Sequence, residues 1–351
     1  MSGDFAERII RWIRGEEKPT LKRFIGKGGF GKVYYGEWKS LDVAVKKLCL
    51  SPQNTSESDL KDIKREIDIL KSLRNNEYVI KYYDVYSDNQ ELLIIMDYAE
   101  NGTLTKFIND NQNKDHDWNF NNNLIKQITQ GLAYIHQENV IHRDLKSMNI
   151  LLAGNYQVKI SDFGLSKFKD INSLYSNYSA VKGTLRWMAP ENLREKIYSK
   201  QSDVYALGMI MWEIAAKCTK PFKDVEDYLI GFNITNNKKE TIPSDTPRNI
   251  YDIIQRCWKD NPSERISLAK IHEIIGNDEV KSQTFYTSIK SLFGFQVSKE
   301  DSKSSSPEEN SKSYQDSGLL ELDFSKKQAE ISQQAQILQK EPFGTPGPSK
   351  K

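Results

Sequence analysis

Two short stretches near the middle of the chain combine residue types suited to phosphoryl transfer. The run I-H-R-D-L-K-S-M-N carries Asp144, Lys146 and Asn149, and the run K-I-S-D-F-G that follows carries Asp162. A carboxylate can orient an attacking hydroxyl, a lysine can neutralise the group in transit, and Asn and Asp offer oxygen ligands to Mg²⁺. Because such a reaction depends on positioning and charge, it requires no Cys or His nucleophile.

A glycine-rich run near the N-terminus could hold the phosphates. It reads G-K-G-G-F-G-K-V and includes Gly26, Gly28 and Gly31 ahead of Val33. Taken alone, this spacing also fits a plain glycine turn or a dinucleotide-binding loop. A dinucleotide loop opens into a helix, whereas K-V-Y-Y-G-E-W is rich in strand-forming residues. The run therefore predicts a strand-turn-strand hairpin that folds over nucleotide phosphates.

A lysine and an acid downstream of the glycines form a candidate pair. In V-A-V-K-K, the period of a strand puts Ala44 and Lys46 on one face and Lys47 on the other. In the next helical pattern, Glu66 lies along the apolar stripe that includes Ile63 and Leu70. Lys46 is therefore the candidate for the phosphates, with Glu66 as its partner.

The elements that must position these groups change in type along the chain. Segments near 21–50 and 79–97 are short and rich in Val, Ile, Tyr and Phe, whereas 57–73, 120–138 and 201–217 have helical apolar spacing. This order predicts an α+β fold: a small sheet lobe with one main helix, then a larger helical lobe, joined at a hinge near 97–101. After about residue 277 the apolar periodicity fades into a Ser-, Lys- and Glu-rich tail, which we expect to be mostly disordered.

Composition narrows the classes of partner. The 50 basic and 48 acidic residues give a formal charge of +2, which favours neither nucleic acid nor a membrane surface as a partner. The three cysteines are far apart and show no metal-ligand spacing, so a reduced, cytoplasmic protein is expected. No signal peptide or membrane span is predicted. Residues 5–14 could form a short amphipathic helix, which we expect to dock on the rest of the protein, with contact to a membrane surface as the alternative.

Taken with G-T-L-R-W-M-A-P-E at 183–191, these motifs resemble the eukaryotic protein kinase family from about Leu21 to Gly276. Within the family, the catalytic loop is similar to that of the tyrosine-kinase-like group, whose members mostly phosphorylate Ser or Thr. The resemblance implies an N-terminal extension over 1–20, a kinase domain over 21–276 with lobes 21–97 and 102–276 around the hinge, and a tail over 277–351. ATP and Mg²⁺ are the implied cofactors. Protein substrates are the implied partners, together with an upstream kinase or a second copy acting in trans.

The resemblance assigns a role to each candidate residue. Asp144, Lys146, Lys46 and Glu66 are expected in catalysis, and Asn149 and Asp162 as metal ligands. The expected nucleotide-binding residues are Ile25, Gly26, Gly28, Gly31, Val33, Ala44, Lys46, Met96, Asp97, Ala99 and Leu151.

The resemblance also implies a scaffold around the site. Glu191 and Arg265 are expected to form a buried ion pair, and Asp203 to hold the catalytic loop through backbone amides. His142 is expected to stack in a structural spine with Phe163, Leu70 and Tyr82. In the segment between Asp162 and Glu191, the hydroxyls of Ser176 and Ser179 are candidates for an activating phosphate, which Arg143 could bind.

Alternatives remain at this point. A scaffold that keeps the fold without turnover would be expected to lose part of the Lys46, Glu66, Asp144, Asn149 and Asp162 set, and here the set is intact. A small-molecule phosphotransferase would not need the peptide-positioning run before Glu191. Tyrosine or dual specificity also stays open, because Trp187 and Met188 occur in both groups of kinases.

Overall fold

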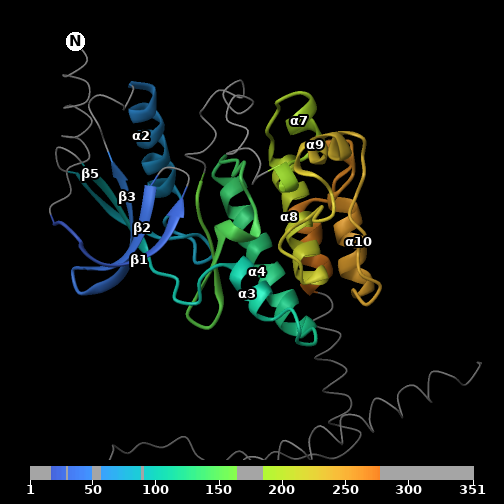
Figure 1. The fold of residues 1–351 in the computed structure, drawn as a ribbon, viewed down its shortest axis with the longest axis horizontal. Helices are drawn as coiled ribbons and strands as arrows, with labels where there is room; N and C mark the ends of the chain where they lie inside the picture. Colours follow the sequence, from blue (N-terminus) through green and yellow to red (C-terminus); the bar gives the residue numbers. More distant parts are fainter. Residues whose placement is uncertain (1–16, 29–30, 50–56, 88–90, 164–184, 277–351) are drawn as a thin grey trace, which may run out of the picture. The chain divides into compact units, whose positions relative to one another are not determined.

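The computed structural model describes residues 17–28, 31–49, 57–87, 91–163 and 185–276. All of them belong to one unit of the chain, Met1–Leu292, and form two lobes (Figure 1). The amphipathic helix expected over 5–14, the segment with Ser176 and Ser179, and the tail lie outside the described residues. Within the described ranges, no helix is long and apolar enough to cross a membrane.

The small lobe is built on one antiparallel sheet with the strand order β1-β2-β3-β5-β4. Its strands are β1 Thr20–Gly28, β2 Gly31–Trp38, β3 Leu41–Cys49, β4 Tyr82–Ser87 and β5 Glu91–Asp97. One face buries a cluster that includes Val43, Val45, Leu93 and Ile95. Side chains alternate along each strand, so Ala44 and Lys46 point to the opposite face, which carries the site.

Helix α2 (Glu57–Ser72) supplies the main helix of this lobe. Its apolar residues recur at helical spacing, and Ile67, Leu70 and Leu73, just beyond its end, are buried in the large core cluster. Glu66 shares the buried side of the helix and is only 4% exposed. The apolar stripe therefore turns an acidic side chain inward.

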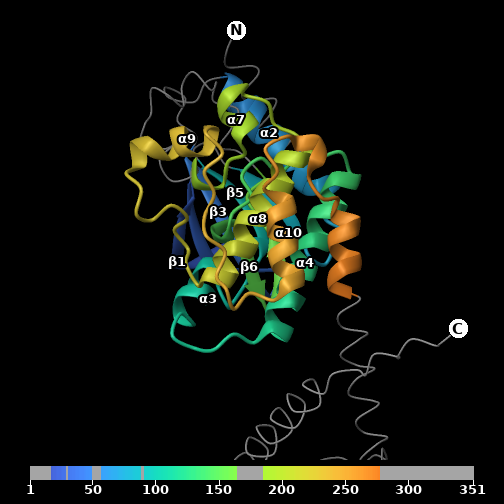
Figure 2. The ribbon, with the colours of Figure 1, turned by 90° about the vertical axis from the view of Figure 1, so that its right-hand side faces the viewer.

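The large lobe is helical and is organised around α8 (Lys200–Ala216), which packs against both α4 and α10 (Figure 1). Figure 2 views these helices from the side of α10. Helix α8 begins at a capping box, in which the side chains of Ser199 and Ser202 each accept from the other residue's backbone N–H. Gly208 lets α10 approach closely, since a Cβ there would lie 2.6 Å from the Cβ of Cys257. Most residues of α8 are buried, which makes it the central support of the lobe.

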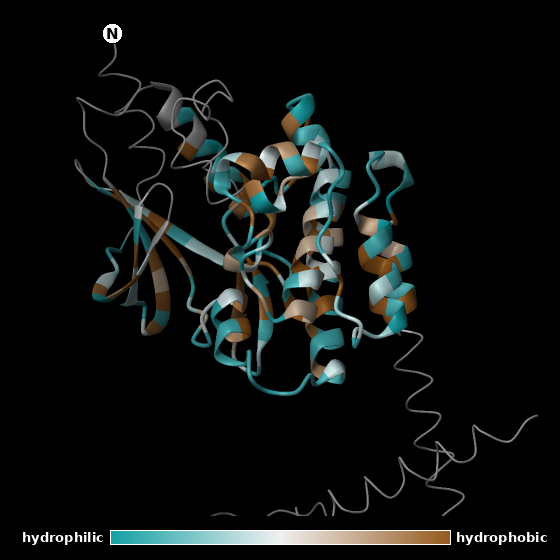
Figure 3. Cartoon of the chain, turned by 45° about the vertical axis from the view of Figure 1, so that its right-hand side comes forward, coloured by the Kyte–Doolittle hydropathy of each residue, from teal (hydrophilic) through white to brown (hydrophobic). Residues whose placement is uncertain are grey.

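The remaining elements surround this helix. The helices are α3 Leu104–Asp110, α4 Trp118–Gln137, α7 Pro190–Arg194, α9 Asp227–Thr235, α10 Arg248–Cys257 and a last helical stretch at 268–276. A two-stranded sheet, β6 Ile150–Ala153 with β7 Gln157–Ile160, faces the small lobe, and 3-10 turns occur at η1 Ser147–Asn149, η2 Leu185–Trp187 and η3 Pro262–Glu264. Hydrophobic residues run through the strands and helices, and the connecting loops are largely hydrophilic (Figure 3).

The expected two-lobed α+β fold is confirmed. The helices predicted at 57–73, 120–138 and 201–217 correspond to α2, α4 and α8, each within about two residues at both ends. Between the lobes, β5 ends at Asp97 and α3 begins at Leu104. The connection predicted at 97–101 therefore falls between the last strand of the small sheet and the first helix of the large lobe.

Candidate active site

Lys46 lies between two carboxylates, one from each lobe. Its Nζ is 3.0 Å from Oδ1 of Asp162 and 3.3 Å from Oε1 of Glu66. Strand β3 holds Lys46, α2 holds Glu66, and Asp162 follows β7 in the large lobe. Lys46 is 4% exposed, whereas the Asp162 side chain is 48% exposed. Lys46 therefore links a buried acid, Glu66, to an acid that faces solvent, Asp162.

Lys46, Glu66 and Asp162 shift one another's pKa values. Burial lowers the pKa of Lys46, but the charges of Asp162 and Glu66 outweigh burial and the net change is a raised pKa. The Lys46 charge holds the pKa of Asp162 below its usual value. Burial raises the pKa of Glu66, with Lys46 opposing. Lys46 is consequently cationic and Asp162 anionic at neutral pH, which are the states needed to bind phosphate oxygens and a metal ion.

The catalytic loop gathers the other predicted side chains. Lys146 Nζ lies 3.0 Å from Oδ2 of Asp144. Asn149 donates from Nδ2 to the backbone oxygen of Asp144 at 2.8 Å and to its Oδ2 at 3.2 Å. The turn η1 brings these three side chains together, since the backbone N–H of Asn149 donates to the Lys146 carbonyl at 2.9 Å. Their short spacing in the sequence thus becomes one cluster.

Asp203 of α8 holds this loop in place. Its carboxylate accepts from the backbone N–H of His142 at 2.8 Å and of Arg143 at 2.9 Å, and His136 Nε2 lies 2.8 Å away. Arg143 has φ of 67°, a left-handed conformation that is uncommon for a residue other than glycine. The predicted scaffold role of Asp203 is confirmed, because it fixes the backbone directly before Asp144.

The spine prediction is also consistent with the packing. The rings of His142 and Phe163 are 5.2 Å apart, and His142 Nε2 lies 3.0 Å from the Ser161 carbonyl oxygen. Leu70 and Tyr82 belong to the same buried cluster as Phe163. His142 is fully buried, which agrees with the structural role expected for it.

The residues predicted as metal ligands suit Mg²⁺. The backbone links them, because Ser161, next to Asp162, donates from its N–H to the Asn149 carbonyl at 2.9 Å. Asn149 uses its Nδ2 on Asp144, which leaves the amide oxygen as its ligand atom. Among the described residues, no group of three or more His, Cys, Asp or Glu is placed so that it could hold a metal ion. A small number of protein ligands is what a Mg²⁺ site requires, because this ion is usually bound by one or two side chains together with substrate phosphates and water.

Strand register collects the predicted nucleotide-binding residues of the small lobe. Val33 pairs with Gly26 and Lys46, and Ala44 pairs with Met96, so these side chains share one face of the sheet. Gly31, which pairs with Gly28, cannot carry a side chain, since a Cβ would lie 2.3 Å from the Lys47 carbonyl oxygen. A Cβ at Gly26 would meet nothing within 4 Å, so that position is open on one side.

The hinge joins this face to the large lobe. Asp97 accepts from Tyr83 Oη at 2.6 Å and lies 3.3 Å from Lys159 Nζ, so its side chain is engaged within the protein. The Ala99 carbonyl accepts from Gly102 at 3.2 Å, and Leu151 bridges to Thr103. Leu151 therefore lies in the large lobe next to the end of the hinge. Ile25 lies in β1 of the small lobe.

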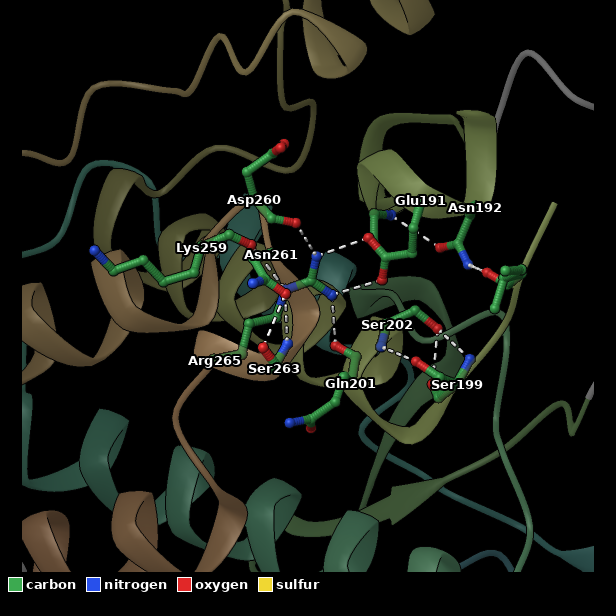
Figure 4. Close-up of polar contacts among 12 residues, drawn as sticks. Glu191, Asn192, Ser199, Gln201, Ser202, Lys259, Asp260, Asn261, Ser263 and Arg265 are labelled. Atoms are coloured by element: carbon green, nitrogen blue, oxygen red, sulfur yellow. Dashed lines mark hydrogen bonds and ion pairs between the residues drawn. The ribbon is translucent and has the colours of Figure 1, made fainter. Parts of the chain in front are cut away.

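The predicted ion pair between Glu191 and Arg265 is present and doubly hydrogen bonded (Figure 4). Arg265 Nη1 and Nη2 each donate to one carboxylate oxygen at 2.7 Å. Arg265 also donates to the carbonyls of Lys259, Asp260 and Gln201, so each charged group in this buried pair has partners. The pair ties the start of α7 to the segment after η3.

Sequence reasoning missed one buried acid near the site, Glu213 of α8. It is fully buried and accepts from Ser147 Oγ at 2.6 Å and from Trp187 Nε1 at 2.9 Å. A charged residue inside the apolar run M-I-M-W-E-I-A-A was the available signal, because such residues are rarely buried without partners.

Comparison with known proteins agrees with this geometry. Residues 20–275 match the family model described as protein tyrosine and serine/threonine kinase. The probable serine/threonine-protein kinase kinX of Dictyostelium discoideum is 31% identical over 252 residues, which are 72% of this chain and 23% of that protein. The BDNF/NT-3 growth factors receptor of Gallus gallus is 30% identical over 280 residues, 74% of this chain and 33% of that protein. The chain thus spans a third or less of these curated relatives. On the family match and the site together, the chain belongs to the protein tyrosine and serine/threonine kinase family.

Proposed function

We propose that this protein transfers the γ-phosphoryl group of ATP to serine and threonine hydroxyls of protein substrates. The observation that carries the proposal is the placement of Lys46, bonded to Glu66 and Asp162, in the same structure as the clustered Asp144, Lys146 and Asn149. A scaffold without turnover would not need all six groups in these contacts. The family supplies ATP as the expected donor.

Each side chain has a role in the proposed reaction. Asp144 accepts a hydrogen bond from the substrate hydroxyl and aims it at the γ-phosphorus, and Lys146, 3.0 Å from Asp144, neutralises charge on the phosphoryl group. Lys46 aligns the α- and β-phosphates, while Glu66 fixes its ammonium. Asn149 and Asp162 would hold Mg²⁺, which when bound bridges the phosphates and offsets their charge.

The adenine site follows from the face shared by both lobes. The purine would lie between Val33 and Ala44 of the small lobe and Leu151 of the large lobe, with Met96 at the back. Backbone groups of Asp97 and Ala99 would bind its edge. Ile25, Gly26, Gly28 and Gly31 would cover the phosphates from β1 and β2.

Serine and threonine specificity rests on the catalytic loop. Lys146 lies directly beside Asp144, where its charge can reach a short hydroxyl-bearing side chain. The relatives include one named as a serine/threonine kinase and one named as a growth factor receptor, so specificity needs a direct measurement. The 351-residue chain, incubated with ATP and Mg²⁺, should label myelin basic protein. Phosphoamino-acid analysis should then give phosphoserine and phosphothreonine; phosphotyrosine alone would refute the specificity, and thermal stabilisation by ATP without labelling would point to a scaffold.

We also propose that phosphorylation of the segment between Asp162 and Glu191 activates the enzyme. Arg143 directly precedes Asp144, and its guanidinium could form charge-assisted bonds with a phosphate on Ser176 or Ser179. An upstream kinase or a second copy of the chain would add it. A phosphatase-treated sample should then show a lag that prior phosphorylation removes. Linear kinetics from the first seconds, unchanged in the Ser176→Ala/Ser179→Ala variant, would contradict the switch.

We propose three parts for the chain: an extension over 1–20, a kinase domain over 21–276 and a tail over 277–351. The boundary of the tail can be tested by deletion. Deleting residues from Ser298 onward removes none of the site residues, so the shortened protein should label myelin basic protein as the full chain does. A large gain or loss of activity would show that the tail regulates the domain.

A cytoplasmic location remains part of the proposal, and the free thiols of Cys218 and Cys257 are compatible with it.

A further inference from the structure

Tyr98 of the hinge contacts β1 and β2, the two strands that carry the glycine-rich run. Its ring packs on the ring of Tyr35 in β2, with 4.7 Å between the centroids and 53° between the planes. Its hydroxyl oxygen accepts from Nη2 of Arg23 in β1 at 3.1 Å. Arg23 and Tyr98 are 75 positions apart, so folding and not chain proximity brings them together. We call Arg23, Tyr35 and Tyr98 the hinge cluster.

The side chains of the hinge cluster also contact one another within the sheet. The guanidinium carbon of Arg23 lies 5.7 Å from the centroid of the Tyr35 ring, a distance at which an aromatic ring attracts a cation. Tyr35 Oη donates to Oδ1 of Asp42 in β3 at 2.5 Å. Arg23 therefore contacts both tyrosines, and Asp42 fixes the orientation of the Tyr35 ring.

The order of the strands gives the contact with Tyr98 its importance. The hinge continues from β5, but β2 and β3 lie between β1 and β5 in the order β1-β2-β3-β5-β4. Sheets twist from strand to strand, so the position of β1 and β2 relative to the hinge would otherwise depend on the twist across β3 and β5. Tyr98, directly after β5, connects the hinge to both strands by its side chain.

The hinge cluster lies on the face of the sheet that carries the site. Paired residues of neighbouring antiparallel strands share a face, and Tyr35 pairs with Ala44 on one side and with Arg23 on the other. Val33, two residues before Tyr35, shares this face because side chains alternate along a strand. The cluster therefore joins the hinge to the strands that hold much of the expected nucleotide-binding set.

The other end of the hinge is bonded to the large lobe. The backbone N–H of Asn101 donates to the Leu152 carbonyl at 3.0 Å, and the N–H of Gly154 donates to Oε1 of Glu100 at 2.8 Å. These bonds fix the hinge on the turn between β6 and β7. Tyr98 thus connects β1 and β2 to a segment that is itself held by the large lobe.

We propose that Tyr98 is a positioning residue that acts through Tyr35 and Arg23 to fix β1 and β2 over the adenine site, and so sets the affinity for the nucleotide. The inference rests on the proposed function, which identifies the nucleotide. It predicts a change in the binding of ADP and ATP. Turnover at saturating ATP and the use of the protein substrate stay the same, because the cluster contains none of the groups proposed to act on the phosphoryl group.

The test measures ADP binding in the presence of Mg²⁺ by isothermal titration calorimetry, together with steady-state labelling of myelin basic protein by the 351-residue chain. Tyr98→Ala should raise Kd for ADP and KM for ATP about tenfold, which corresponds to about 1.4 kcal/mol and is the scale of an aromatic pair. The values of kcat and of KM for myelin basic protein should stay within about twofold. Tyr98→Phe keeps the ring and loses only the acceptor for Arg23, so Kd should rise by about threefold or less.

Phe24→Ala is the matched control, because it removes a ring from the same two strands. Phe24 follows Arg23 in β1 and its ring lies 5.8 Å from that of Tyr34, which points to the opposite face of β2 from Tyr35. The variant leaves the hinge cluster intact, so Kd for ADP should stay within about twofold of wild type.

Tyr35→Ala tests the same contact from its other side. It should raise Kd for ADP about as much as Tyr98→Ala, and the double variant should show no further loss, because the interaction is already absent in each single variant. Should Tyr98→Ala fail to fold, Tyr35→Ala alone measures the effect of losing the ring contact.

The outcomes separate this inference from the proposed function. If Tyr98→Ala binds ADP as the wild type does, the inference is wrong. It is also wrong if Phe24→Ala weakens binding equally, since any loosening of β1 and β2 would then suffice, or if Tyr35→Ala binds ADP normally, since Tyr98 would then act without Tyr35. A wild type that binds no ADP would overturn both. A wild type that binds ADP without labelling any protein would contradict the proposed function alone, and the Kd values would still decide the inference.

Discussion

Lys46 Nζ lies 3.0 Å from Asp162 Oδ1 although the two residues are 116 positions apart. One belongs to β3 of the small lobe and the other follows β7 of the large lobe. This contact therefore joins the two lobes. Lys46 is bonded to Glu66 of α2 at the same time. The two contacts of the Lys46 ammonium group thus depend both on the position of α2 and on the distance between the lobes.

Lys46→Met should abolish most phosphoryl transfer while leaving ATP binding largely intact. The substitution removes the cation that aligns the phosphates, and kcat should fall on the order of 10³-fold, with KM for ATP changed by less than about tenfold. The measurement is steady-state labelling of myelin basic protein over a range of ATP concentrations.

Lys47→Met is the matched control for this variant. Lys47 is the next residue of β3, points to the opposite face and forms a partly exposed ion pair with Glu91. Its loss should leave kcat within about twofold of wild type. Equal losses in both variants would mean that the sheet, and not the Lys46 charge, controls activity.

Asp162→Asn should eliminate turnover with the fold retained. The amide is nearly isosteric but neutral, and the side chain is half exposed, so the metal site weakens without a cavity forming. We expect a loss of at least about 10³-fold in kcat and a melting temperature within about 2 °C of wild type. Asp110→Asn, at an exposed acid of α3, provides the control. Near-normal labelling by the Asp162 variant would remove Asp162 from the proposed metal site.

The sequence predicted which side chains the structure brings together, because these groups lie in short motifs or on strongly patterned elements. Asp144, Lys146 and Asn149 occur within one loop, and their cluster requires only the turn η1. Strand period placed Lys46 inward, and the helical stripe did the same for Glu66. The register between strands follows from the hairpins, so Val33 and Ala44 could be assigned to one face.

Contacts that span distant elements were not predictable in the same way. Glu213 lies 66 positions from Ser147, and nothing in the run around it specifies which polar groups will face it. The engagement of the Asp97 side chain with Tyr83 and Lys159 was missed for the same reason. Such pairings depend on how helices and sheets pack, which periodicity within one element does not determine.

Breaking the buried pair between Glu191 and Arg265 should destabilise the protein strongly. Arg265→Leu leaves Glu191 as an uncompensated acid that is only 8% exposed at its side chain, and such losses cost about 3–5 kcal/mol. Urea unfolding monitored by fluorescence would measure the change. The pair between Arg194 and Asp260 is the control, because both side chains are more than a third exposed and Arg194→Met should cost about 1 kcal/mol or less. Similar costs for the two variants would contradict this account of the buried pair.

Glu213 should make the folded protein less stable as pH rises. Burial raises its pKa to about 8 in the folded state, whereas an unfolded glutamate titrates near its ordinary value of about 4.3. Between these values the folded state binds more protons than the unfolded state, so stability is fully present below pH ~4 and declines until pH passes ~8. Glu213→Gln removes this titration. The free energy of unfolding of the variant relative to wild type should therefore rise by on the order of 1 kcal/mol per pH unit between pH 5 and 8. Urea unfolding at several pH values would measure this difference, with Glu195→Gln, an exposed acid, as the control. A difference that stays constant over this range would show that Glu213 is ionised in the folded protein throughout.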